Sequence, residues 1–501
     1  MSSKVKMMVI SKYLCYAQGN KMLNCIKKGC NYISNNYYKY FGTCKGTSKK
    51  EVSNKYSEQI ESCYTSNGMR LVCEYRDSFT TTLGCLVPAG AMHEMPKERG
   101  SAIFLEHLLL RRTECHNQEQ LEMLLGEIGG KISTIALRDM FIIYGTVAPC
   151  EVDKLVHIFA DIIFNSIICD EDVEREKCVI LYELSKMESE KEKVIMDYLP
   201  TIAYQDTALA NSVYPETNVI KKFCSETLVE FQKRTFKTHL MTMICTGSIC
   251  LEELQRIVYK YFDATEDHRS SLDCSNNTQS CTDSLEYRFS GSDLRLRDDD
   301  DELGYVAIGV EGPGSEEWED HFTLTVAKEF VGCWDTSSGG ANHNAPLIAH
   351  YSFNTDLCYL YKSFFHKWAQ STSIWGCYFV CSKLNLENMI DMIQREWMKL
   401  CICITEKEVA RAVNQCKMKE LMIQNNPTNR FFDIVKHIFR YGCYDPIPNR
   451  VAEYEKVTPD KVRVAAEKYI YDQSPAVVAM GRIENLPPYY VIRNGMFLLR
   501  Y

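Results

Sequence analysis

The chain has 501 residues, of which 46% are hydrophobic and 25% charged, proportions typical of a globular protein with more than one domain. No run of about 18 uncharged apolar residues occurs, so no membrane-spanning helix is predicted. The formal net charge of −9 argues against nucleic-acid binding, which needs a basic surface. The 24 cysteines form no C-x-x-C pair, and we interpret them as reduced thiols that pack like small apolar residues.

The first 50 residues differ in charge from the rest of the chain. They contain ten lysines and no acidic residue before Glu51. A basic, acid-free and partly amphipathic start is typical of a mitochondrial transit peptide, although arginine is absent; a Lys/Asn-rich tail is the alternative. We predict a transit peptide and disordered lead over residues 1–54, with cleavage on import between about residues 25 and 60.

From residue 60 onward, strand and helix patterns alternate. The first half predicts, in chain order, two β segments within Met69–Val87 around a polar turn at Arg76–Ser78, a loop at Gly90–Gly100, a buried helix at Ser101–Arg112, an amphipathic helix at Gln118–Ile128, a strand pattern at Lys131–Val147, and helices at Pro149–Asn165 and Asp170–Glu190.

The composition becomes polar and linker-like between residues 264 and 286. The same order then resumes, with a strand at Leu303–Val310, a helix at Asp320–Val331 and a glycine-containing loop at Ser337–Gly340. Two halves of similar length and order indicate an internal duplication of an α+β unit.

The residues that indicate chemistry are Ile103–His107, which read IFLEH. On a helix, positions 103 and 107 share a face and Glu106 lies beside them. Zinc peptidases with the inverted motif H-x-x-E-H bind zinc through both histidines and use the glutamate as the base that deprotonates a metal-bound water. The Glu–His pair is present here, but Ile103 has no lone pair to offer a metal.

A second acidic segment follows in the chain. Glu176 and Glu183 are seven residues apart, which places them on one helical face. Acids on a helix usually form a solvated face, and a Glu–His pair on an apolar helix is usually an ordinary buried pair. Val179, Ile180 and Leu184 nevertheless mark the helix as partly buried, so we predict a role for some of its acids.

Several segments carry a resemblance to a known family. The chain resembles the β-type branch of the mitochondrial processing peptidases and the related core subunits of respiratory complex III, within the pitrilysin/insulinase group of inverted-motif zinc proteases. The matching segments are GSAIFLEHLLLRRT (100–113), ADIIFNSII (160–168), EREKCVILYEL (174–184), AYQDTAL (203–209), SGSDLRLRDD (290–299), GCWDTSSGG (332–340), IWGCYFVC (374–381) and SPAVVAMGRIENLP (474–487).

The resemblance implies a role for each residue of the constellation. His107 matches the second zinc histidine, Glu106 the general base and Glu183 the distal carboxylate ligand. Glu176 matches an acid that orients the site from behind the ligands. Ile103 replaces the first zinc histidine. With two of three protein ligands left, the resemblance implies zinc that is weakly bound or absent.

A second departure lies beside the cleft. The family's Asn-Ala-x-Thr-like strand, along which an extended peptide adds as an extra strand, reads Ser133–Ala136 here, while Arg138 and Asp139 keep the charges that follow it. His93 in the preceding loop and Cys115 after the helix are candidate substitute ligands, although neither has the one-turn spacing.

The resemblance implies an α+β fold of two homologous domains, each a mostly antiparallel sheet with helices packed on one face, at residues 55–265 and 285–501 with a linker at 266–284. It also implies a mitochondrial location, in the matrix or on the matrix side of the inner membrane. The partner would be an α-type processing-peptidase or core-subunit homologue, and presequence peptides would be ligands.

Three functional readings stay open from the sequence. The first is a catalytically impaired β-like subunit that acts as a structural, presequence-binding or complex III core subunit. The second is an active zinc metalloendopeptidase subunit that cleaves presequences with weak zinc or a replacement ligand. The third is a binding module of another kind.

Overall fold

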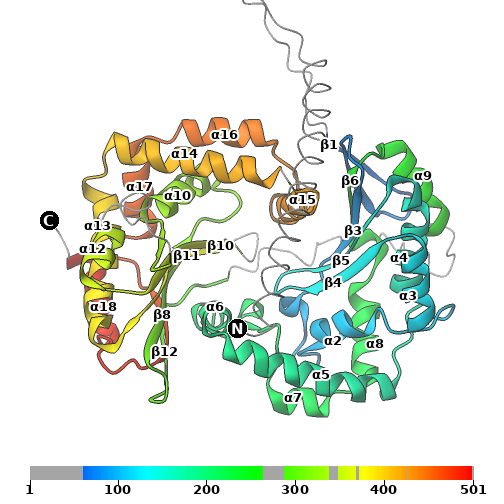
Figure 1. The fold of residues 1–501 in the computed structure, drawn as a ribbon, viewed down its shortest axis with the longest axis horizontal. Coiled ribbons are helices and arrows are strands. Elements are labelled where there is room, and N and C mark those ends of the chain that lie inside the picture. The colour runs from blue at the N-terminus through cyan, green and yellow to red at the C-terminus, as the bar shows by residue number, and fades with distance from the viewer. Residues whose placement is uncertain (1–59, 263–286, 338–347, 368–371, 425, 499–501) are drawn as a thin grey trace, which may run out of the picture. The chain divides into compact units, whose positions relative to one another are not determined.

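The computed structural model describes residues 60–262, 287–337, 348–367, 372–424 and 426–498 (Figure 1). The gap after residue 262 separates two halves of the chain. The predicted transit peptide at 1–54, the predicted linker at 266–284 and most of the loop at Ser337–Gly340 lie outside the described residues, and the proposed domain limits remain predictions.

The first half contains a six-stranded sheet in the order β1-β2-β6-β3-β5-β4. Its strands are β1 (Ile60–Tyr64), β2 (Arg70–Tyr75), β3 (Thr81–Val87), β4 (Lys131–Ala136), β5 (Phe141–Val147) and β6 (Thr242–Gly247). Its helices are α2 (Ser101–Leu108), α3 (Gln118–Glu127), α4 (Val152–Phe164), α5 (Asp170–Ser189), α6 (Lys191–Ala203), α7 (Thr217–Lys222), α8 (Ser225–Thr235) and α9 (Leu251–Phe262).

The second half contains another six-stranded sheet, in the order β7-β12-β8-β11-β10-β9. Its strands are β7 (Asp293–Arg297), β8 (Leu303–Gly312), β9 (Cys333–Asp335), β10 (Leu360–Lys367), β11 (Ser373–Ser382) and β12 (Ala476–Gly481). Its helices are α10 (Trp318–Val331), α12 (Ile348–Thr355), α13 (Leu386–Ile402), α14 (Glu406–Ile423), α15 (Pro427–Tyr441), α16 (Ile447–Glu455), α17 (Pro459–Tyr469) and α18 (Tyr489–Leu498).

The two sheets repeat one topology. In the first, β2 pairs in parallel with β6, and β3, β5 and β4 follow as antiparallel neighbours. In the second, β7 pairs in parallel with β12, and β8, β11 and β10 follow in the same way. This repetition confirms the predicted α+β class with mostly antiparallel sheets. Among the described residues, no helix is long and apolar enough to cross a membrane.

The predicted elements differ from the observed ones mainly at their ends. The strand pattern at Lys131–Val147 is two strands, β4 and β5, joined by a turn in which the Leu137 amide donates to the Met140 carbonyl at 2.8 Å. The turn residues Leu137–Met140 include neither glycine nor proline, so the sequence carries no strong turn signal there. The helix predicted to reach Arg112 ends at Leu108.

Each sheet buries one face against its own helices and receives a helix from the other half on the second face. On the first sheet, Phe431, Ile434, Val435 and Ile438 of α15 pack with a cluster that includes Val72, Leu86, Met140, Ile142 and Ile244. On the second sheet, Ile195, Leu199 and Ile202 of α6 pack with a cluster that includes Ala307, Ile374, Tyr378 and Val478. The two halves therefore exchange helices.

The sequence of α15 explains why a helix forms there. Asn426 accepts a hydrogen bond from the Thr428 amide at 2.9 Å, and Pro427 occupies the first helical position, where its missing N–H costs nothing. Gly442 ends the helix in the left-handed conformation with φ of 71°. Phe431, Ile434, Val435 and Ile438 recur at the spacing of one helical face, which is the face placed on the first sheet.

Because α6 packs on the second sheet, we expect a smaller side chain at its buried face to lower the stability of the protein. Ile195→Val removes one buried methylene equivalent from a fully buried side chain, and we expect it to lower the free energy of unfolding by about 0.5–1.5 kcal/mol. Ile402→Val, at a position that is 44% exposed, is the matched control and should change little. All five tryptophans lie in the second half, so a fluorescence-detected urea titration shows whether the loss reaches that half.

Candidate functional site

Helix α2 presents Glu106 and His107 near its C-terminal end, and its N-terminus is held by Glu94. The Glu94 carboxylate accepts hydrogen bonds from the Gly100 amide at 2.8 Å and from the Ala102 amide at 2.7 Å. Burial raises the pKa of Glu94 to about 8, and these two backbone N–H groups act in the opposite direction. Glu94 therefore accepts hydrogen bonds from backbone N–H groups at the start of α2, which have no partner within the helix.

Helix α5 supplies the two glutamates predicted to lie on one face. His107 Nε2 lies 3.2 Å from Glu183 Oε2, and His107 Nδ1 lies 3.4 Å from Glu176 Oε2. The Glu176 side chain is buried, while Glu183 is partly exposed. The structure thus brings together His107, Glu176 and Glu183, with the imidazole at ion-pair distance from both carboxylates.

Ile103 occupies the position one turn before His107. Its side chain is 1% exposed and belongs to the hydrophobic core of the first half. The helix therefore presents an apolar side chain to the core where the inverted motif has a histidine. No nitrogen, oxygen or sulfur atom is available at this position.

Glu106 is joined to β4, the edge strand beside it. The Ala136 amide donates to Glu106 Oε2 at 2.8 Å, and the Thr134 hydroxyl donates to the Glu106 carbonyl at 2.8 Å. Burial raises the pKa of Glu106, the Ala136 N–H and His107 lower it, and Glu183 raises it further. The carboxylate that the resemblance assigns as a base is thus also an acceptor for the strand edge.

Two further residues, Arg111 and Tyr214, complete the surroundings and were not predicted from the sequence. Arg111 contacts Glu176 and also donates to Gln118 Oε1 at 2.8 Å. Arg111 lies in the turn after α2, which ends at Leu108. Burial raises the pKa of Tyr214 to about 12, and Glu183 and Glu106 add to the shift; the sequence offers no signal for it.

The two candidate substitute ligands do not join the site. The carbonyl of His93 accepts from Arg234 at 2.8 Å, and burial lowers the pKa of its imidazole to about 4. Cys115 is exposed. Within the described part of the chain, no group of three or more His, Cys, Asp or Glu side chains has an arrangement that could hold a metal ion.

The donor set can be compared with what catalytic zinc requires. Such a zinc takes three protein ligands and leaves one position open. Here His107 and Glu183 are one imidazole and one carboxylate 3.2 Å apart, and Ile103 supplies no donor. The residues present therefore do not fit the catalytic zinc of the inverted-motif peptidases.

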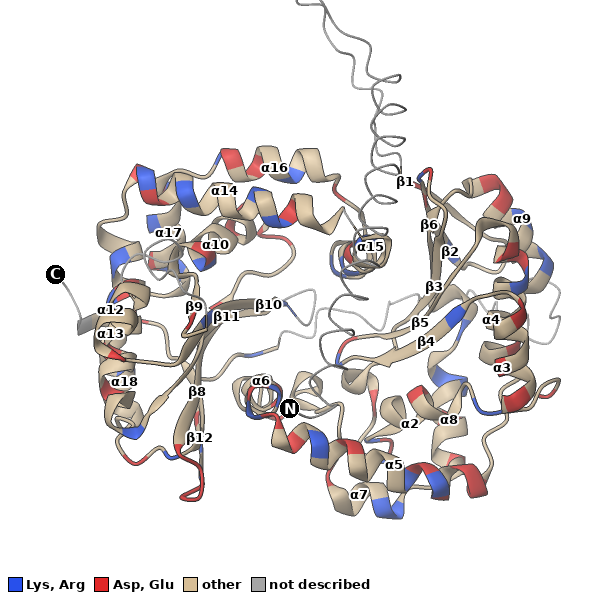
Figure 2. Ribbon diagram, in the orientation of Figure 1, with Lys and Arg blue, Asp and Glu red and all other residues tan. Residues whose placement is uncertain are grey.

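The constellation opens into a cavity of about 660 Å³. Its charged lining consists of Glu106, Arg138, Glu183, Lys186, Glu190, Lys193 and Asp197, together with His366 from β10. Arg138 is already engaged, since it donates to Asp197 Oδ1 at 2.6 Å and to the Leu209 carbonyl at 2.7 Å. Figure 2 shows both acidic and basic residues on α5, which forms one wall.

A second cavity of about 1010 Å³ shares Asp197 and Tyr214 with the first. Its charged lining consists of Glu94, Arg99, Glu188, Asp197, Asp206 and Glu216. Acidic side chains therefore outnumber basic ones around the joined cavities, which favours cationic ligands.

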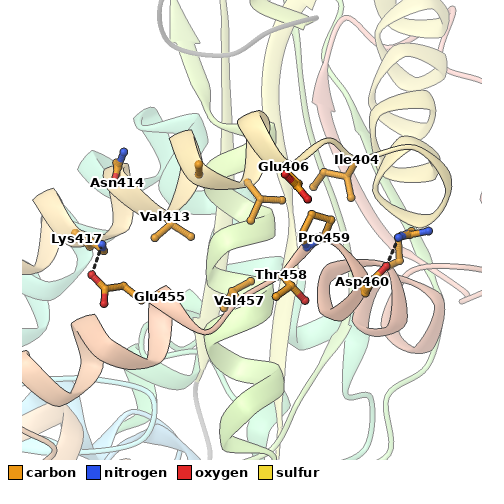
Figure 3. A pocket seen from close by; sticks show the side chains of 13 residues that line it. Ile404, Glu406, Val413, Asn414, Lys417, Glu455, Val457, Thr458, Pro459 and Asp460 are labelled. Carbon is orange, nitrogen blue, oxygen red and sulfur yellow. Dashed lines mark hydrogen bonds and ion pairs between the residues drawn. The ribbon is translucent and has the colours of Figure 1, made fainter.

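A third cavity, of about 670 Å³, lies between α14, α16 and α17 (Figure 3). Its cations are already paired: Lys417 Nζ donates to Glu455 at 2.6 Å, and Arg463 contacts Asp460. The rest of its lining is largely apolar or uncharged. Neither Glu106 nor Glu183 lines it, so it is separate from the predicted constellation.

A duplicated α+β fold with a Glu–His pair on the helix that follows the first central strand defines the class of inverted-motif peptidase folds. Comparison with known families agrees. Residues 70–217 match the family described as Insulinase (Peptidase family M16), and residues 222–416 match the Peptidase M16 inactive domain. The chain therefore belongs to the insulinase family, M16.

Several individual proteins are similar to this chain along most of its length. The chain is 32% identical to the mitochondrial-processing peptidase subunit beta of Mus musculus over 437 residues, 87% of each chain. It is 31% identical to the cytochrome b-c1 complex subunit 1 of the same organism over 437 residues, 87% of this chain and 89% of the relative. A chain of complex III2 from Candida albicans shares the fold, with a TM-score of 0.75 and 19% identity over 88% of this chain and all of that one.

Proposed function

We propose that this chain is a mitochondrial, β-like member of the family whose peptidase activity is impaired, and that it acts as a structural or presequence-binding subunit, or as a complex III core subunit. The observation that carries the proposal is the donor set around His107. Ile103 turns an apolar side chain into the core at the first ligand position, while Glu176 and Glu183 contact the two ring nitrogens of His107.

The relatives support the assembly part of the proposal. Two sets of them are named as subunits, one of a mitochondrial processing peptidase and one of the cytochrome b-c1 complex. Both match along most of their length, which supports a subunit role for this chain. We propose an α-type homologue as the partner, and the lysine-rich start of the chain supports import into the mitochondrial matrix.

The cavities support binding of basic peptides. Mitochondrial presequences are basic, and the carboxylates around the joined cavities would attract them. The open edge of β4 could pair with an extended peptide, since β5 is its only strand partner among the described residues. Zinc, in this proposal, is held weakly or not at all.

An active presequence peptidase is the second candidate. It is favoured by one observation, the position of Glu106 in the cavity wall with Glu183. Burial raises the pKa of Glu106, the direction that favours a general base. This candidate requires a metal ligand in place of Ile103.

The two candidates differ in the effect of Glu106→Gln. We expect protein purified with its partner to carry well under one zinc per chain, as measured by mass spectrometry of the metal, because catalytic zinc needs about three protein ligands. We also expect Glu106→Gln to leave cleavage of a presequence peptide within about twofold of wild type, since a general base contributes about 10²–10⁴-fold where it acts.

Glu188→Gln is the control, because Glu188 lies on α5 with Glu183 and lines the neighbouring cavity without belonging to the constellation. A full zinc together with loss of cleavage in Glu106→Gln alone would establish the active peptidase. Recovery of the chain as a monomer without a partner would contradict the subunit proposal.

A further inference from the structure

A group of buried nitrogen atoms surrounds the ring of Tyr441, the last residue of α15. Lys367 Nζ lies 4.4 Å from the centre of this ring. The rings of His321 and His437 lie 5.9 and 5.5 Å from it. The group therefore joins the end of β10, the first turns of α10 and the C-terminal turn of α15 (Figure 1).

The nitrogen atoms of this group lack acceptors. Among the described residues, no hydrogen-bond partner is found for Lys367 Nζ, His321 Nδ1, His437 Nδ1 or the neighbouring Arg440 Nε, although each atom is shielded from solvent. The Lys367 residue is 3% exposed. Buried polar groups are normally hydrogen-bonded, so three side chains with unmatched nitrogens around one ring, and a fourth on the adjacent residue Arg440, need an explanation.

The tautomer of His437 shows that its unmatched ring nitrogen is a hydrogen-bond donor. His437 Nε2 lies 3.0 Å from Arg450 Nη1, and because a guanidinium only donates, Nε2 is the acceptor. In the neutral imidazole the proton then resides on Nδ1. The unmatched His437 Nδ1 is consequently a donor, like the Lys367 amine and the Arg440 Nε–H.

The nearby carboxylates do not supply the missing hydrogen-bond acceptors. Asp433 is held by Arg450 at 2.7 Å. Asp139 interacts electrostatically with Arg440 and Lys436, but no ion pair between described residues joins it to either. Lys367, Arg440 and Lys436 thus bring more positive charge than Asp139 offsets. The N-terminal end of α10, which bears His321, adds a partial positive charge.

Burial and Arg440 together lower the pKa of Lys367 to about 7. This is the expected response of a buried amine that has cations and no anion beside it. A bound anion would reverse the effect and keep the amine protonated.

We propose that Lys367, His321 and Arg440, around the ring of Tyr441, form a binding site for a small oxyanion, either a carboxylate or inorganic phosphate. Every unmatched group of known character donates, and an oxyanion offers several acceptor oxygens at once. The site is independent of the Glu106–His107 constellation and of the proposed function. It would fasten α15, which lies on the first sheet, to β10 and α10 of its own half.

The proposal is tested by calorimetric titration of the full-length chain with sodium phosphate and, separately, sodium acetate, at constant ionic strength set by sodium chloride. We expect saturable binding, in the millimolar range or tighter, of at least one of them. Lys367→Met should weaken it by about 10- to 100-fold, the value of a hydrogen bond to a charged group. Binding of phosphate alone or of acetate alone supports the proposal and identifies the oxyanion.

Two variants keep the test independent of folding. Lys362→Met, on the same strand but half-exposed and paired with Glu192 at 2.7 Å, is the matched control and should bind like wild type. His321→Phe keeps a ring in place and removes its nitrogens, and it should weaken binding by about tenfold. Absence of saturable binding by wild type, or equal binding by wild type, Lys367→Met and His321→Phe, would overturn the proposal.

Discussion

Arg430→Met is expected to destabilise the protein by about 3–5 kcal/mol, because it leaves Glu74 as a buried carboxylate without its counter-charge. Arg430 Nε and Nη2 donate to Glu74 Oε1 at 2.9 and 2.6 Å, and the two residues are 1% and 4% exposed. Arg430 lies on α15 and Glu74 on β2, so the pair joins the halves. The free energy of unfolding from a urea titration measures the effect.

Two comparisons separate this expectation from a general effect of losing an arginine. Arg463→Met removes a surface arginine that contacts an exposed Asp460, and such pairs contribute about 0–1 kcal/mol. The double variant Glu74→Gln, Arg430→Met should recover much of the loss, since no uncompensated charge remains. Circular dichroism reports on both halves and tryptophan fluorescence only on the second. Equal stability of Arg430→Met and Arg463→Met would contradict the assignment.

Ile103→His is expected to raise zinc affinity by more than about 100-fold, because it adds a third protein ligand where even residues behind the ligands change affinity by about 10–100-fold. Position 103 is one turn before His107, and residues four apart share a helical face. Bound zinc per chain after dialysis, together with competition against a chelator, measures the gain.

Ile103→Gln is the matched control, since it also places a polar side chain in the core but provides a poor zinc ligand. Adding Glu183→Gln to Ile103→His should remove most of the gained affinity if Glu183 is the distal ligand. Presequence cleavage should return less completely than zinc, because β4 at Ser133–Ala136 also departs from the family pattern and binds Glu106 through the Ala136 amide. A wild-type chain that already holds a full zinc would contradict the impaired-site proposal.

The sequence predicted element types well where periodicity was strong. The helices at Gln118–Ile128 and Asp170–Glu190 were observed within one residue at each end. A capping box at Asn117 and Gln120 begins the first of them, and acidic residues in the first turn begin the second. The strand pattern at Lys131–Val147 concealed a hairpin turn. The core-facing residues are even-numbered in β4 (Ile132, Ala136) and odd-numbered in β5 (Phe141, Ile143), but the turn between the strands contains neither glycine nor proline, the strongest turn signals.

The site residues remain predictions, although the structure shows how close together some of them lie. His107, Glu176 and Glu183 came from spacing and from the family resemblance, and the fold brought them together. Tyr214 and Glu94 were missed because each reaches the site from a loop, where no period relates sequence position to direction.

The sequence by itself determined which donor atoms the chain can offer: it places isoleucine at position 103 and leaves one imidazole and one distal carboxylate. It also determined the family through segments spread along most of the chain. Only the tertiary structure decided that α6 and α15 are exchanged between the sheets, that Arg430 pairs with Glu74, and that Lys367 is buried with no acceptor among the described residues. The reason is physical: periodicity shows that a helix has an apolar face, whereas the surface that covers this face depends on the path of the whole chain.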